Sequence, residues 1–181
     1  EAVLAVKSVL VDLNDAAATL PNSYNSVENI TPLETPLSST INGAALATPV
    51  FLSLYAENDL RLDKYFAETD EKGFRKNKKA GSNNYLCTFR VGEIYLTAAE
   101  AAARLGELSQ ARTRLLELMR KRYAPEAYEA KSVVVNAMDK EALVQEILDE
   151  RARELAFEGH RWFDLRRSTR PRLEKVLDGT R

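Results

Sequence analysis

The chain contains very few of the residues that build thiol and metal sites. Its 181 residues include one cysteine and one histidine, which are Cys87 and His160. A single cysteine excludes an intrachain disulfide and a cysteine-based metal site, and a single histidine excludes any site that needs two imidazoles. We therefore expect no bound metal and no cofactor.

Long apolar runs and net charge are also missing. No stretch approaches the roughly 18 apolar residues of a membrane-spanning helix, and the formal net charge is −1. Such a molecule has no overall attraction for nucleic acid or for an anionic membrane. No signal peptide is present. Because the chain opens on Glu1, already inside a helical pattern, it is interpreted as a piece of a longer protein.

The first part of the chain combines a short helical pattern with a long irregular stretch. Apolar residues recur at three- and four-residue spacing over residues 1–20 and predict an amphipathic helix there. Residues 21–88 are rich in Pro, Ser, Thr, Asn and Gly at first, and they predict an irregular, loop-rich lobe. Within it, the lysines from Lys72 to Asn84 are expected on a solvated turn or hairpin tip.

Residues 89–181 are predicted to be helical. The alanine-rich run 93–105 ends at Gly106, which readily terminates a helix, and a second helix follows over 108–122. Small residues facing each other across this pair resemble the tetratricopeptide (TPR) hairpin. Pro125 is placed in a connector, and a third long helix is expected to end near Gly159. The fold class is therefore mainly α, with TPR-like helical hairpins and an irregular lobe in a single domain over residues 1–181.

Residues 150–167 (ERARELAFEGHRWFDLRR) carry the densest charge of the chain. Such density is compatible with a catalytic carboxylate pair, a basic reader of nucleic acid, or an ion-paired corner between helices. Helical spacing places Glu150 and Glu154 on one face with arginines beside them. We expect a structural corner in which Glu154 or Glu158 pairs with Arg161 or Arg90, and Trp162 is expected to be buried.

The other two explanations of this charge find little support. Carboxylates are so abundant that many pairs have the separation a glycosidase needs, and neighbouring arginines oppose a raised pKa on either acid. The C-terminal arginines lack interleaved aromatic side chains for stacking on bases. We therefore expect neither an enzyme nor a nucleic-acid-binding protein.

Three blocks of the chain together resemble the SusD/RagB family. These blocks are residues 58–66 (NDLRLDKYF), 89–101 (FRVGEIYLTAAEA) and 150–167, and they occur in the family's order. The resemblance implies a C-terminal portion of a surface lipoprotein that binds starch-like or other oligosaccharide nutrients at the bacterial outer membrane. It further implies delivery of the ligand to a TonB-dependent, SusC-like transporter during polysaccharide utilization, without enzymatic activity. Membrane contact would come only through an N-terminal lipid anchor that this chain does not contain.

Sugars stack their apolar C–H faces on exposed aromatic rings, so aromatics near the irregular region are the ligand-binding candidates. These are Tyr24, Tyr55 and Tyr85. The alternative function is a TPR-like protein–protein interaction scaffold without sugar binding.

Overall fold

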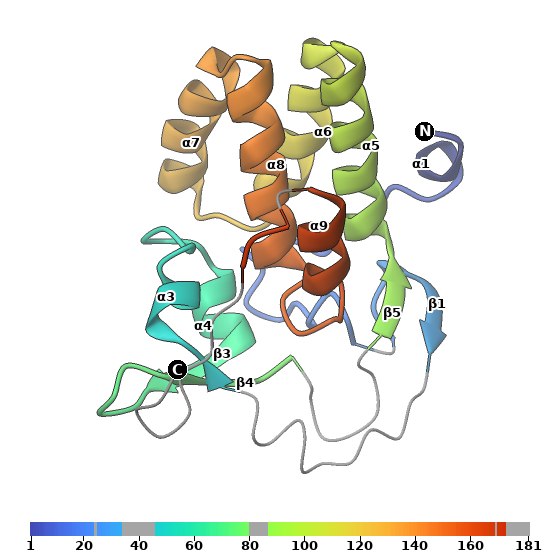
Figure 1. Ribbon diagram of the computed structural model, residues 1–181. Coiled ribbons are helices and arrows are strands. Elements are labelled where there is room, and N and C mark those ends of the chain that lie inside the picture. Colours follow the sequence, from blue (N-terminus) through green and yellow to red (C-terminus); the bar gives the residue numbers. More distant parts are fainter. Residues whose placement is uncertain (24, 34–45, 80–86, 169, 173–181) are drawn as a thin grey trace.

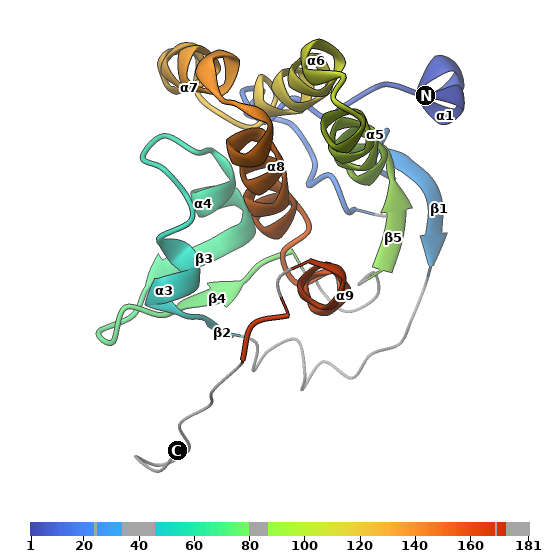
Figure 2. The same ribbon diagram turned by 45° about the horizontal axis from the view of Figure 1, so that its top comes forward.

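Four helices form the main body of the protein in a computed structural model that describes residues 1–23, 25–33, 46–79, 87–168 and 170–172. They are α5 (Val91–Leu105), α6 (Leu108–Met119), α7 (Pro125–Ala137) and α8 (Lys140–Glu154). Figures 1 and 2 show the four helices side by side, with the strands and most of the short helices at one end of them and the N-terminal helix beside α5. The prediction of a mainly α, TPR-like fold is confirmed.

The hairpin of α5 and α6 forms because small residues let the two backbones approach. Ala99, Ala103 and Ala111 are fully buried between the helices. Gly106 ends α5 in the left-handed conformation, with φ of 88°, where a side chain would be strained. Leu96 and Leu115 belong to the main hydrophobic cluster, which α8 completes with Leu143 and Ile147.

The placement of Pro125 in a connector was wrong. Pro125 is the first residue of α7, a helix of 13 residues. Proline suits this position because its fixed φ is helical and the amide hydrogen it lacks would have no partner in the first turn. Helix α7 then packs beside α6 and precedes α8, so a second helical hairpin follows the first.

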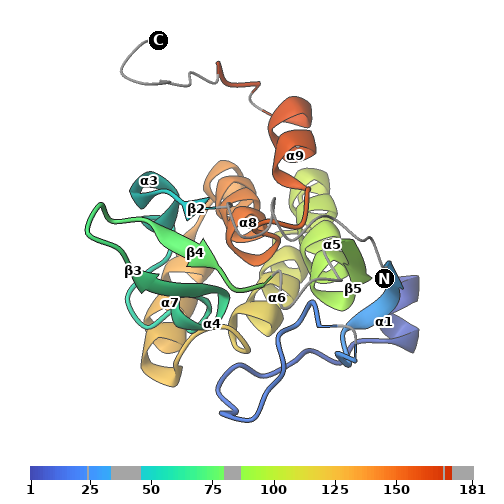
Figure 3. The ribbon, with the colours of Figure 1, turned by 90° about the horizontal axis from the view of Figure 1, so that it is seen from below.

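The prediction of a helix over residues 1–20 is also wrong after residue 6. Helix α1 covers only Ala2–Val6, and Lys7 is already extended. The following segment uses its backbone amides for distant partners: Val11 donates to Glu28 Oε1 at 2.9 Å, and Leu13 donates to the Lys121 carbonyl at 2.9 Å. These bonds replace helical ones, and the segment runs past the ends of α5 and α6 (Figure 3).

In the lobe between the first segment and α5, the described residues form two small sheets and two short helices. Strands β1 (Asn29–Leu33) and β5 (Cys87–Arg90) pair antiparallel. Strands β2 (Leu46–Ala47), β3 (Phe66–Thr69) and β4 (Arg75–Asn77) form a second sheet in the order β2-β4-β3. Helices α3 (Pro49–Leu52) and α4 (Arg61–Tyr65) pack with this sheet around a second apolar cluster. The turn between β3 and β4 covers residues 70–74, so the predicted tip, Lys72 to Asn84, contains the end of this turn and also strand β4.

The last helix, α9 (Arg161–Arg167), exposes two aromatic side chains. Trp162 is 55% exposed and Phe163 is 68% exposed, so the expectation that Trp162 is buried was wrong. The reason is the anchoring of α9 by its polar face. Asp164 is buried and receives ion pairs from Arg151 at 3.1 Å and Arg167 at 2.6 Å, which leaves the aromatic side facing solvent. No helix in the described part of the chain is long and apolar enough to cross a membrane.

Candidate functional site

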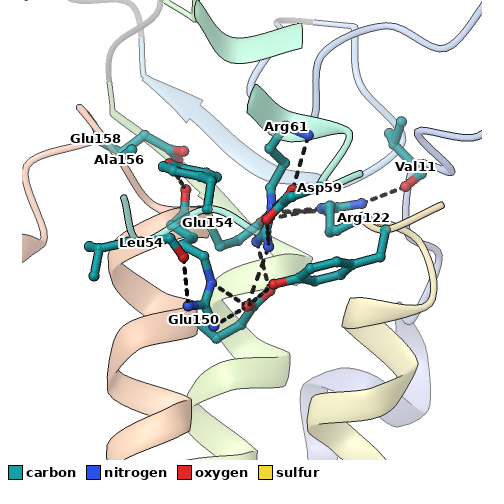
Figure 4. Close-up of polar contacts among 12 residues, drawn as sticks. Val11, Leu54, Asp59, Arg61, Arg122, Glu150, Glu154, Ala156 and Glu158 are labelled. Carbon is teal, nitrogen blue, oxygen red and sulfur yellow. Dashed lines mark hydrogen bonds and ion pairs between the residues drawn. The ribbon is translucent and has the colours of Figure 1, made fainter. Parts of the chain in front are cut away.

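The charged block at the end of α8 forms a buried ion cluster centred on Glu154. Its carboxylate accepts hydrogen bonds from three guanidinium groups, at 2.6 Å from Arg90, 2.9 Å from Arg122 and 3.2 Å from Arg61. All four side chains are fully buried. Figure 4 shows how Arg61 and Arg122 converge on Glu154 from separate segments of the chain, with Arg61 also reaching Glu150.

Further acids complete the cluster around each arginine. Arg61 also pairs with Asp59 at 2.8 Å and Glu150 at 2.6 Å. Glu28 forms ion pairs with Arg122 at 2.5 Å and with Arg90 at 3.1 Å. A buried charge is tolerated only when it is paired and hydrogen-bonded, and these contacts satisfy that condition.

Lys79 joins the cluster from the far end of the β3–β4 hairpin. Its ammonium donates to the carbonyls of Glu154 at 2.9 Å and Ala156 at 3.1 Å, and it forms an ion pair with Glu158. Burial lowers the Lys79 pKa to about 8, although Glu158 acts in the opposite direction. The prediction that the lysines of this tip are solvated is therefore wrong for Lys79.

The electrostatics of the cluster suit a structural role. Burial alone would raise the pKa values of Glu150 and Glu154, but the surrounding guanidinium groups outweigh it and keep both pKa values lowered. A general acid needs the opposite shift and access to substrate. The predicted corner is confirmed for Arg90, which pairs with Glu154 and with Glu158 at 2.8 Å. Arg161, the alternative partner, is exposed.

Of the three tyrosines predicted to bind ligand, Tyr55 lies among the described residues. Tyr24 and Tyr85 lie outside the described residues. Tyr55 is 7% exposed, and its ring packs edge-on against Phe66 and Phe51 with centroids 5.5 and 5.8 Å apart. A sugar would reach this ring only after those side chains moved, so ligand contact at Tyr55 stays a prediction.

A surface groove of about 560 Å³ lies elsewhere, between the segment that follows α1 and helices α5, α6 and α7. A cavity of this size lies within the range of small-ligand sites. The groove is lined by eleven side chains, with apolar and polar ones mixed: Ser8, Leu10, Asp12, Asn14, Tyr95, Glu117, Arg120, Lys121, Pro125, Tyr128 and Glu129.

The sequence contained only a weak signal for this groove. Tyr95 is 5% exposed and belongs to the main hydrophobic cluster. Tyr128 lies one turn into α7, the helix that was not predicted, and it is half-buried. Aromatic residues outside the irregular region therefore had no reason to be selected.

Metal binding has no support in the described residues. They contain no group of three or more His, Cys, Asp or Glu side chains arranged to hold a metal ion. The acids that cluster around Glu154 are instead neutralised by arginine and lysine.

Comparison with known proteins gives a consistent family and fold. The model of the SusD family matches residues 44–175. A search of the curated proteins finds no match. A solved structure of a SusD-like carbohydrate binding protein from Bacteroides vulgatus ATCC 8482 has a TM-score of 0.64 and 22% sequence identity. The alignment covers 91% of this chain and 39% of that chain, so the likeness shows the fold over a part of the longer protein.

Proposed function

Because the chain belongs to the SusD family, we propose that it is part of a protein that binds oligosaccharides at the surface of a bacterial outer membrane. The bound ligand would pass to a TonB-dependent, SusC-like transporter. The observation that carries the proposal is the family match, which extends from the lobe through α9. The solved neighbour supports it, because that protein is described as carbohydrate binding.

The geometry favours binding over catalysis. The dense carboxylates of α8 are buried under arginines and hold helices and lobe together, so they are not available to a substrate. The groove beside α7, by contrast, presents an aromatic ring and polar groups to solvent. We expect no enzymatic activity and no nucleic-acid partner.

Glycan binding is tested by affinity electrophoresis and calorimetry on a panel of soluble polysaccharides. The chain is measured together with any longer protein that contains it. Retardation or heat on at least one polysaccharide, abolished by the corresponding free oligosaccharide, is the expected result. Absence of binding by both proteins across the panel would refute the proposal.

A second candidate function is a protein-binding helical scaffold, and the exposed aromatic side of α9 is the observation that favours it. Large exposed aromatics are enriched at protein interfaces. Trp162 is the only tryptophan, so its fluorescence reports on this surface alone. A blue shift of the emission on adding a helical peptide, without any response to glycans, would favour the scaffold.

A further inference from the structure

We propose that the groove between residues 8–14 and helices α5–α7 binds an uncharged oligosaccharide, with the ring of Tyr128 as its stacking surface. This inference rests on the proposed function and assigns its ligand contact to a site that differs from the predicted tyrosines. It follows from the composition of the groove, from polar groups there that lack partners among the described residues, from the contacts that hold its wall and from its charge.

The groove has the mixed surface that a sugar ring requires. A pyranose carries apolar C–H patches on its faces and hydroxyl groups around its edge. The groove offers apolar area from Leu10, Pro125 and Tyr128 and polar groups from the other lining residues. A ligand lying on the Tyr128 ring would therefore direct its hydroxyl groups toward side chains that donate or accept hydrogen bonds.

Several polar groups of the groove have no partner in the described part of the chain. Neither the Arg120 guanidinium nor the Tyr128 hydroxyl forms a hydrogen bond or ion pair with another described residue, although both line the groove. Arg120 is exposed and Tyr128 is half-buried. The arginines around Glu154 are all paired, so these free donors distinguish the groove from the structural cluster.

Hydrogen bonds and an ion pair join the wall formed by residues 8–14 to the neighbouring helices and their connection. The Tyr95 hydroxyl donates to the Ser8 carbonyl at 3.1 Å. Asp12 forms an ion pair with Lys121 at 2.8 Å, and Asn14 donates to the Tyr123 carbonyl at 3.3 Å. A wall that is already ordered reduces the entropy lost on binding.

The charges of the groove favour an uncharged ligand. Its lining contains three carboxylates, on Asp12, Glu117 and Glu129, and two cations, on Arg120 and Lys121. Lys121 pairs with Asp12, and Glu117 pairs with Arg114 outside the lining. Glu129 and Arg120 remain as one acid and one cation, so the groove carries no net charge that would attract a uronate or sulfated glycan.

The test measures binding of the full chain to uncharged oligosaccharides (malto-, xylo- and galacto-oligosaccharides) and to polygalacturonate and chondroitin sulfate. Two variants alter the groove, Tyr128→Ala and Arg120→Ala. Two matched controls alter an aromatic and an arginine outside it, Phe163→Ala and Arg166→Ala, both exposed on α9. We expect each groove variant to weaken binding of the uncharged ligand by roughly tenfold, with the controls unchanged.

Each outcome separates the inference from the function on which it rests. Binding by the wild-type chain that both groove variants retain would overturn the groove and leave glycan binding standing. Preference for the polyanions would overturn the ligand class. No binding by the wild-type chain would overturn the inference, and the longer protein would then decide the proposed function. Melting curves show whether Tyr128→Ala loses binding only because it unfolds. In that case Arg120→Ala, which changes an exposed side chain, decides whether the groove binds the ligand.

Discussion

The Nη1 atom of Arg61 lies 2.6 Å from Oε1 of Glu150, although the two residues are 89 positions apart in the chain. Both side chains are fully buried. Arg61 begins α4 in the lobe, and Glu150 is on α8, so this pair joins the two parts of the molecule (Figure 4). Arg61 also forms ion pairs with Asp59 and Glu154, so three buried acids share its positive charge.

Replacing Arg61 by methionine should destabilise the protein strongly. The substitution keeps much of the side-chain volume but leaves buried carboxylates without their cation, at a cost of about 3–5 kcal/mol. The free energy of unfolding from urea titration measures the effect. Arg161→Met, at an exposed position, is the matched control and should change stability by no more than about 0.5 kcal/mol. Equal effects of the two substitutions would contradict the central role of Arg61.

Substituting Gly92 by alanine should also destabilise the protein, against the usual order of helix propensities. Alanine in a helix normally stabilises a protein by about 1 kcal/mol relative to glycine. A Cβ at position 92, however, would lie 2.5 Å from Nη1 of Arg90 and 3.2 Å from Oε1 of Glu154. Arg90 cannot yield without breaking its own ion pairs, so we expect a loss of about 1–3 kcal/mol. A higher melting temperature for Gly92→Ala would show that the cluster rearranges freely.

The helical hairpin was predictable because its determinants are local. Alanine spacing and Gly106 specify α5, its end and the return of α6 within a short stretch of sequence. The corner at α8 was predictable in kind, since acids and arginines alternate there and Arg90 belongs to the same family pattern. Its remaining partners were not. Glu28 meets Arg122 across 94 positions, and local spacing contains no information about such a contact.

The groove and the structure of the first segment could not be predicted from the sequence for a related reason. Residues 8–14 have helical spacing, but the backbone of Leu13 bonds to Lys121 and not to its own turn. Tertiary contacts therefore override a local pattern there. Without that segment in place, and without α7, nothing in the sequence brings Tyr128 near Asn14.

Acidification should weaken the fold through the same cluster. The pKa values of Glu150, Glu154 and Glu158 are lowered in the folded protein from the ordinary value of 4.5, because nearby guanidinium groups outweigh the effect of burial. The unfolded chain then binds protons more readily than the folded one. The stability from these groups is present above about pH 4.5 and is lost as the pH falls toward their folded pKa values.

Urea titrations between pH 7 and pH 3 measure this dependence. The free energy of unfolding should fall with decreasing pH, and Glu154→Gln should show a smaller fall because one of the lowered carboxylates is gone. A wild-type stability that stays constant to pH 3 would show that these acids gain nothing from their arginines.

Lys79 should produce a second dependence of the same sign at alkaline pH, because the unfolding free energy again rises with pH. Its pKa is lowered by burial from 10.5 to about 8 in the folded protein. Between these values the unfolded chain holds a proton that the folded chain has released. The unfolding free energy therefore gains up to about 1.4 kcal/mol per pH unit from this residue as the pH rises.

The difference between the wild-type chain and Lys79→Met isolates this contribution, because other lysines and tyrosines titrate equally in both. At pH 7 the variant loses the hydrogen bonds to the Glu154 and Ala156 carbonyls, but it also removes a desolvated charge. Subtracting the two unfolding free energies from pH 7 to pH 10.5 should give a curve that rises in favour of the wild-type chain above about pH 8. A flat difference would mean that Lys79 keeps its ordinary pKa and that Glu158 compensates fully for its burial.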